Sequence, residues 1–281
     1  GRVTSSGAAS AAPYPYTFIF KAVIKMRLKK RTFSGVVLEQ EVYTLPDRCQ
    51  VGGDLNKKLR FESEEARKQH RDGIARRRYL KIFNATFSPS SLYSTLTFDN
   101  ANEVHTFKEA RQLRDNFYNR LKYKYPNAVI VLHMGRGKHT KRIHMHMVSE
   151  GVPAADIKKQ WIYGEIVDVQ PLRAHNFYDG VDHGTDYTGL ANYLFDHWTE
   201  EQGGHRYKIS RNYIRPEEEP PKEVKRDYSL TKAPQAPAGY ELVEATATIY
   251  GYLYFKYIKI PEDRQEPPKR RRKGQAASAA L

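Results

Sequence analysis

The chain has 281 residues, and its 47 lysines and arginines against 32 aspartates and glutamates give a net charge of +15. A folded chain of this charge is typical of proteins with a polyanionic partner, above all nucleic acid. No apolar run approaches the roughly 20 residues of a membrane span, and the first residues lack the pattern of a secretion signal. The single cysteine, Cys49, excludes an internal disulfide and a cysteine-rich zinc finger. We therefore expect a cytoplasmic protein without membrane contact.

The N-terminal third combines alternating sequence with a basic run. Residues 1–13 are small and polar, and we expect them to be flexible. Residues 14–60 are expected to form a β-rich extension, because they alternate as far as Tyr43 with a turn at Ser34-Gly35. Residues 61–89 form a connector with a helix over 62–83, whose basic side chains include Arg76, Arg77 and Arg78. Such a run is typical of a solvated helix face, but beside a phosphate-handling domain it becomes a candidate DNA contact.

Residues 90–215 are the best-patterned part of the chain. A capping box of Thr106 and Glu109 opens an apolar helical stripe that Pro126 ends. The expected elements are a strand at 93–99, that helix, a hairpin of strands 128–134 and 142–149, a helix after Pro153, a strand at 164–170 and a helix at 185–198. The first six follow the ferredoxin-like split βαβ order, an antiparallel sheet with helices on one face. This predicts an α+β fold whose second sheet face is open to a ligand.

The C-terminal part differs in composition. Residues 216–239 are rich in proline and glutamate, which predicts a linker. Residues 240–262 alternate and predict one or two strands, and residues 263–281 form a basic tail that we expect to be disordered. No Walker-type phosphate loop is present, so we expect no attached ATP-driven helicase.

Two histidines stand out within the segment RIHMHMVS. Strand alternation puts His144 and His146 on one face, with Ile143, Met145 and Met147 on the other. Two imidazoles about 6 to 7 Å apart along a strand can chelate one metal ion, although exposed sheet histidines without a ligand show the same spacing.

Three stretches resemble the HUH endonucleases, and among them the rolling-circle replication initiators (Rep proteins) of phages and plasmids. They are STLTFD at 94–99, RIHMHMV at 142–148 and GLANYLFDHW at 189–198, in the order of the family's motifs. The resemblance covers roughly residues 90 to 215. It implies that His144 and His146 bind Mg²⁺ or Mn²⁺, and that Tyr193 is the nucleophile that nicks DNA and stays joined to its 5′-phosphate. It also implies single-stranded or hairpin origin DNA, a bacterial host cytoplasm, and a host helicase and polymerase as partners.

The third metal ligand stays open at this stage. His197 lies four residues after Tyr193 on the same helix face, whereas His133 lies on the strand before the histidine pair, and we favour His197. Many family members carry a lysine three positions after the tyrosine, where this chain has Asp196. The positive side chain that this lysine would provide is then expected from Lys138, Lys141 or Arg142. Arg211 is a further candidate phosphate contact.

Other interpretations remain. Tyr187 lies about 240° around the helix from Tyr193, so we expect it to pack rather than react. Thr95 and Thr97 are expected beside the histidines as support, and the loop with His175, Asp182 and His183 either lines the site or only turns the chain. A transposase or relaxase would use the same chemistry. A non-enzymatic nucleic-acid-binding module could share the ferredoxin-like scaffold, and a structural zinc site lacks the usual four-ligand spacing.

Overall fold

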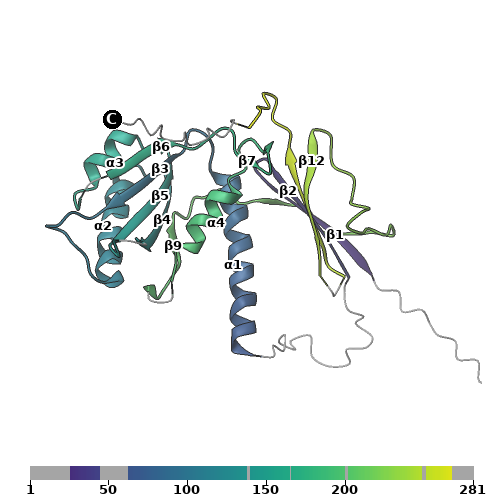
Figure 1. Cartoon of the computed structure of the whole chain (residues 1–281), viewed down its shortest axis with the longest axis horizontal. Coiled ribbons are helices and arrows are strands. Elements are labelled where there is room, and N and C mark those ends of the chain that lie inside the picture. The colour runs from purple at the N-terminus through teal and green to yellow at the C-terminus, as the bar shows by residue number, and fades with distance from the viewer. Residues whose placement is uncertain are drawn as a thin grey trace, which may run out of the picture.

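The structure, a computed structural model, describes residues 26–44, 63–137, 140–164, 166–199, 202–248 and 251–267. These residues form a mixed α+β fold of four α-helices and antiparallel sheets, which confirms the predicted class. Two larger sheets lie on either side of the long helix α1 (Glu64–Thr86), whose N-terminal half extends beyond both of them (Figure 1). None of the described helices combines the length and the apolar character that a membrane span requires.

The five-stranded sheet holds the central part of the chain. Its order is β6 (Ile166–Pro171), β3 (Leu92–Thr97), β5 (Ile143–Glu150), β4 (Val129–Arg136) and β9 (Tyr207–Ile209). Every neighbouring pair is antiparallel, and β4 and β5 form the predicted hairpin. The register places Thr95 and His133 directly opposite His146 on the two neighbouring strands. The centre of this sheet therefore presents polar side chains from three strands.

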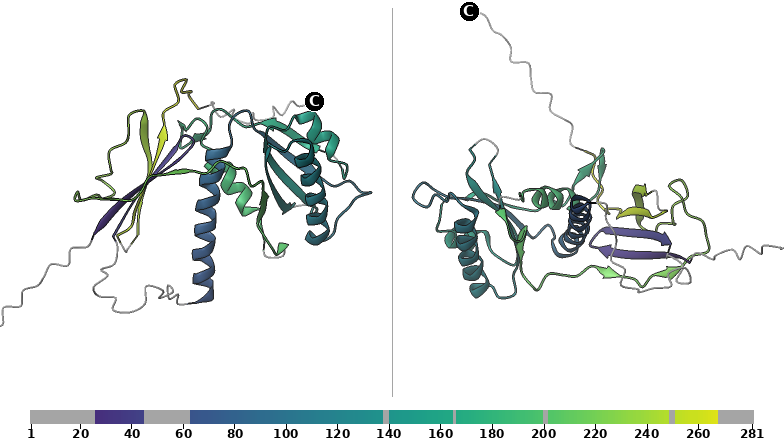
Figure 2. Two further views of the ribbon diagram at one scale, coloured as in Figure 1. Left: turned by 180° about the vertical axis from the view of Figure 1, so that it is seen from behind. Right: turned by 90° about the horizontal axis from the view of Figure 1, so that it is seen from below.

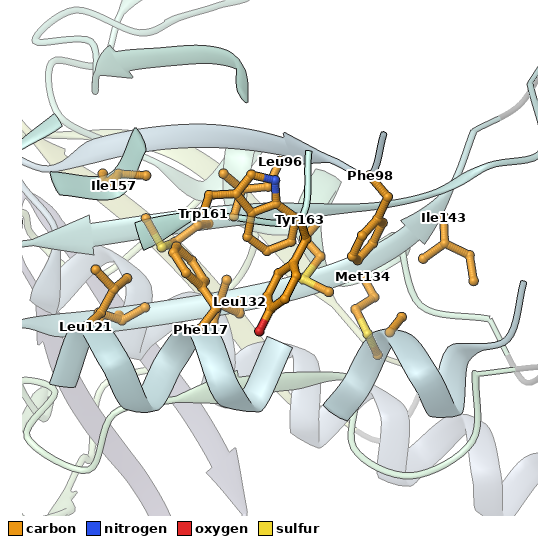
Figure 3. Close-up of a cluster of buried hydrophobic side chains, with 14 of the residues drawn as sticks. Leu96, Phe98, Phe117, Leu121, Leu132, Met134, Ile143, Ile157, Trp161 and Tyr163 are labelled. Carbon is orange, nitrogen blue, oxygen red and sulfur yellow. The ribbon is translucent and has the colours of Figure 1, made fainter. Parts of the chain in front are cut away.

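Helices α2 (Phe107–Lys124) and α3 (Ala154–Gln160) cover one face of this sheet. The predicted capping box is present at the start of α2, where Thr106 and Glu109 bond to each other's backbone amides. The apolar side of α2 meets the inward residues of the strands in a core that includes Phe117, Leu132 and Trp161 (Figure 3). The methionines of β5 also point into this core, so strand alternation leaves the histidines on the opposite face.

The opposite face is not open along its whole length, as the sequence led us to expect. Helix α4 (Thr188–Asp196) and the C-terminal half of α1 pack on it, and their contact includes Tyr79, Phe83, Leu194 and Phe195. The sequence did not predict that α1 packs on the sheet, because α1 is mostly basic and its buried apolar residues are confined to its last turns. The region around the histidines, with Tyr193 at its edge, stays accessible on this face.

The second sheet joins segments from both ends of the chain. Its order is β10 (Glu217–Glu218), β1 (Arg27–Ser34), β2 (Val37–Thr44), β13 (Leu253–Lys259) and β12 (Tyr240–Ala247), and β11 (Lys222–Glu223) also pairs with β1. The predicted turn at Gly35 and the two C-terminal strands are therefore confirmed. The segment 216–239 is not a free linker, because β10 and β11 pair with β1 and Val224, Tyr228 and Ala236 pack on the sheet. Residues 1–25, 45–62 and 268–281 lie outside the described part, and with them Cys49 and most of the basic tail.

A buried ion pair connects the second sheet to α4. Lys256 of β13 donates to Asp186 at 2.7 Å and to the Thr188 hydroxyl at 3.0 Å, immediately before and at the start of α4. Asn84 of α1 donates to the same hydroxyl at 3.1 Å. Figure 2, seen from below, shows α1 between the two sheets, next to α4. The start of α4 is thus fixed from two directions.

Candidate metal centre

The two histidines of β5 converge on one point. Their Nε2 atoms are 3.1 Å apart, and His144 is half-buried whereas His146 is 4% exposed. Two hydrogen-free imidazole nitrogens at this separation repel each other unless a proton or a cation lies between them. The pair therefore has the donor arrangement of a chelate.

His197 completes the group from the end of α4. One nitrogen each from His144, His146 and His197 lies within 4.8 Å of the others, so these three histidines could hold a metal ion. The Nδ1 of His197 lies 2.8 Å from the carbonyl oxygen of Tyr193, which can only accept, so Nδ1 carries the proton. In this tautomer the lone pair of Nε2 is available to a cation. Three protein ligands leave further coordination positions open, as in catalytic rather than structural sites.

His133, the alternative third ligand, is not part of this group. It is fully buried, and its Nε2 lies 2.7 Å from the hydroxyl of Tyr79 on α1. Its other nitrogen has no partner among the described residues. Burial, the neighbouring His197 and Arg114 lower the pKa of His133 to about 3, so the ring is neutral. The residue belongs to the packing between β4 and α1.

Residues behind the ligands fix their orientation. The hydroxyl of Tyr93 on β3 lies 2.7 Å from Nδ1 of His146, and the Thr95 hydroxyl lies 3.3 Å from the same nitrogen. Hydrogen bonds of this kind hold a ligating ring in one tautomer and direct the opposite nitrogen at the metal. Gln202 holds the end of α4 by donating to the carbonyls of Met134 and His197.

The electrostatics of the site favour neutral imidazoles. Burial, together with the neighbouring His144 and His197, lowers the pKa of His146 to about 3. Burial also lowers the pKa of His144, against a hydrogen bond with the backbone of Arg142 that raises it. Neutral rings offer lone pairs, so neither His144 nor His146 has to lose a proton at neutral pH to bind a cation.

Tyr193 lies beside the three histidines. Its ring centroid is 4.3 Å from that of His197 and 5.8 Å from that of His146, and the residue is 51% exposed. Tyr187, in contrast, is buried and donates its hydroxyl to the carbonyl of Arg173, so it packs as expected. One exposed phenol and three imidazoles therefore share one side of the sheet.

Gly135 makes the approach of His197 possible. It lies on β4 opposite His144, and a Cβ atom at this position would meet Cδ2 of His197 at 2.7 Å and Nε2 of His144 at 3.4 Å. A larger residue would displace one of the two rings. In the predicted hairpin Gly135 falls just after the strand 128–134, so nothing in the sequence indicated this contact, and Tyr93 and Gln202 were not predicted as site residues either. For Tyr93 a signal was available, since it shares the strand face of Thr95.

The basic residues expected to contact DNA fall into different environments. Arg77, Arg78, Lys141 and Arg211 are exposed, and Lys138 lies outside the described residues. Arg142 donates to the carbonyl of Phe98, near His144. Arg76 does not project freely, because it pairs with Asp196, donates to Asn192 and stacks on Phe195. It therefore joins α1 to α4, and Asp196 is its partner.

In the loop after β6, the polar residues His175, Asp182 and His183 stabilise the loop and are not part of the metal centre. His175 pairs with the buried Asp182 at 2.8 Å, and the backbone amides of Gly184 and Gln265 donate to the same carboxylate. His183 lies 3.6 Å from Asp186. These contacts hold the loop against the segment that follows β13 (Leu253–Lys259).

No protein-family model, curated protein or solved structure matches this chain. The geometry of the three histidines and the exposed tyrosine is thus the basis on which a function can be assigned.

Proposed function

We propose that this protein is a metal-dependent single-stranded DNA nicking and joining enzyme of the HUH endonuclease type, which starts rolling-circle replication. The observation that carries the proposal is the position of Tyr193, exposed and directly beside the group of His144, His146 and His197. A phenol beside three imidazoles that could hold one metal ion is a combination suited to attack on a phosphodiester.

The fold supports this proposal. The order β6-β3-β5-β4, antiparallel throughout, is the order that a split βαβ unit produces. The histidine pair lies on its central strand β5, and the tyrosine lies on a helix packed on the same face. These are the places that the resemblance to the replication initiators implies.

The donor set is compatible with a divalent cation. His144, His146 and His197 would hold it, and a set rich in histidine favours Mn²⁺ over Mg²⁺. When bound, the cation would offset the charge of a non-bridging phosphate oxygen. Tyr93 and Thr95 hold His146 in the orientation that this requires.

In the proposed reaction the oxygen of Tyr193 attacks the phosphorus while the bond to the 3′ oxygen breaks. The proton lost by the tyrosine is balanced by the proton that the 3′ oxygen gains. One phosphodiester is exchanged for another, so the reverse reaction rejoins the strand without an added energy source. The released 3′-hydroxyl is a primer end, which makes a helicase and a polymerase the expected partners.

The experiment is a covalent capture assay. The protein is incubated with Mn²⁺ and a randomised single-stranded DNA library, and denaturation-resistant protein–DNA adducts are measured. We expect an adduct with the wild type and none with Tyr193→Phe, while salt-sensitive DNA binding is kept. Tyr123→Phe is the matched control, because Tyr123 is a more exposed tyrosine on α2, away from the site.

Two outcomes would contradict the proposal. An adduct that survives in Tyr193→Phe would exclude this tyrosine as the nucleophile. Absence of any adduct with the wild type, together with intact single-strand binding, would favour a non-enzymatic nucleic-acid-binding module.

A further inference from the structure

Two cavities flank the candidate metal centre. One, of about 480 Å³, is bounded by Tyr193 and Tyr93. The other, of about 450 Å³, is bounded by His144 and Arg142 together with the end of β3. His144 itself lines the second cavity, and the first is lined by Tyr93 and Tyr193, whose rings lie beside His146. A strand bound at the centre therefore has room on both sides of its phosphate.

The walls of the cavity beside Tyr193 fit an unpaired nucleobase. Aromatic side chains come from three elements: Tyr93 on β3, Phe177 and Tyr178 on β7 (Phe177–Tyr178), and Tyr193 on α4. Gln170 and Arg173, both exposed, add an amide and a cation at its edge. Base stacking on aromatic rings combined with a cation for the backbone is a general mode of single-strand binding.

The cavity is rigidly built on its inner side. Tyr178 donates to the carbonyl of Asp186, and its hydroxyl accepts from the amide of Gly189 at the start of α4. A Cβ at Gly189 would meet that hydroxyl at 2.7 Å. The β7 strand and the helix that carries Tyr193 are thus in direct contact, so the pocket and the phenol keep a fixed relative position.

In-line displacement decides which nucleotide lies on which side. The attacking and leaving oxygens lie on opposite sides of the phosphorus, so the 3′ oxygen leaves away from Tyr193. The nucleoside that keeps the phosphate through its 5′ oxygen stays attached to Tyr193 after the attack. We propose that the cavity of Tyr93, Phe177 and Tyr178 binds the base of this nucleotide, the first one 3′ to the cut.

This inference rests on the proposed function and adds specificity-determining residues to it. Phe177 provides a stacking surface, and Gln170 can hydrogen-bond to the edge of the base. Arg173 has no carboxylate partner among the described residues, so its guanidinium is available to the next phosphate. The site thereby holds the 5′-phosphate end while the 3′-hydroxyl end is free to leave.

The test uses the full chain, Mn²⁺ and an oligonucleotide recovered from the wild-type adduct in the randomised library. That oligonucleotide is compared with a copy that carries an abasic site directly 3′ to the cut. We expect the wild type to form the adduct about tenfold more slowly on the abasic copy. Phe177→Ala should be slow on both and distinguish them by less than about twofold, whereas Phe177→Tyr, which keeps the ring, should retain the full difference.

Asn100→Ala is the matched control, because Asn100 lines the cavity on the opposite side of the metal centre. It should keep the tenfold sensitivity to the abasic site. The assignment of this cavity would be wrong if the wild type formed the adduct equally fast on both oligonucleotides, or if Phe177→Ala kept the tenfold difference. Neither result would contradict the proposed nicking activity. A wild type that forms no adduct at all would overturn the nickase and this inference together.

Discussion

His197 donates a hydrogen bond from Nδ1 to the main-chain carbonyl of Tyr193, 2.8 Å away and one helical turn earlier. The proposed nucleophile and the third metal ligand are therefore held by the same turn of α4. A shift of this turn would move both groups together with respect to His144 and His146 on β5. The position of α4 on the sheet is thus the main geometric requirement of the site.

Gly135→Ala should disturb the metal centre with little effect on the fold. The added Cβ would lie 2.7 Å from Cδ2 of His197, so the ring must move away from the other two ligands. We expect the affinity for Mn²⁺ to fall about tenfold or more, measured by isothermal titration calorimetry.

The control for this substitution is Gly73→Ala in the middle of α1, where an added Cβ meets nothing within 4 Å. It should leave Mn²⁺ binding unchanged and stabilise the helix by up to about 1 kcal/mol. Wild-type Mn²⁺ affinity in Gly135→Ala would show that His197 does not take part in binding.

Tyr93→Phe should weaken metal binding through His146. The change removes only the hydroxyl that lies 2.7 Å from Nδ1 of His146, and leaves the Thr95 hydroxyl at 3.3 Å as a poorer partner. Loss of such an outer hydrogen bond typically reduces metal affinity by about 10- to 100-fold. Mn²⁺ titration and the melting temperature are the two measurements.

Tyr118→Phe provides the comparison, since its hydroxyl donates to Ser210, away from the metal ligands. Both variants lose one hydrogen bond worth about 1 kcal/mol, so their melting temperatures should fall by similar amounts. If both variants also lost Mn²⁺ affinity equally, the role of Tyr93 would be purely structural.

The local parts of the fold could be predicted from the sequence. The alternation of β5 fixed which face His144 and His146 share, because a strand has a strict period of two. The capping box at Thr106 located the start of α2 for a similar local reason. In both cases the deciding interactions join residues a few positions apart.

Long-range arrangements could not be predicted in this way. The second sheet pairs β2 with β13, more than 200 residues later in the chain, and no local pattern records such a pairing. The sequence favoured His197 over His133, but it could not show the contact that engages His133. The hydroxyl of Tyr79 lies 2.7 Å from Nε2 of His133, and Tyr79 belongs to α1, whose place on the sheet no local pattern gives. The packing of α1 on the sheet face that carries the histidines is also a long-range contact, so it could not be predicted either.

Arg76→Ala and Arg77→Ala should separate a structural role from DNA binding. Arg76 holds Asp196 and Asn192 of α4, so its loss should lower the melting temperature and slow adduct formation. Arg77 is exposed and pairs with no carboxylate of the described residues, so its loss should weaken DNA binding at an unchanged melting temperature.

Salt dependence provides the second measurement for this pair. If Arg77 neutralises one phosphate, Arg77→Ala should reduce the slope of log affinity against log salt by about one. Equal effects of the two substitutions on both the slope and the melting temperature would contradict the distinction drawn between them.

Asp186→Asn should change how the stability of the protein depends on pH. Burial alone would raise the pKa of Asp186, but His183, Lys256 and Thr188 outweigh it and hold the pKa well below its usual range. A carboxyl with a depressed pKa contributes stability above its unfolded pKa of about 4, and this contribution is lost as the pH falls below that value. The asparagine variant leaves Lys256 buried without its partner, which should cost about 3–5 kcal/mol at neutral pH.

Denaturant unfolding between about pH 7 and pH 3 checks this, with Asp179→Asn as the control. Asp179 is exposed and has a φ of 50°, a conformation that asparagine also adopts, so its substitution should leave the curve unchanged. The difference between the wild type and Asp186→Asn should begin to shrink as the pH falls below about 4, because the unfolded wild type then binds a proton that the folded state, with its lowered pKa, does not bind. A difference that stays constant down to about pH 3 would mean that the Lys256–Asp186 ion pair does not connect the second sheet to α4 in solution.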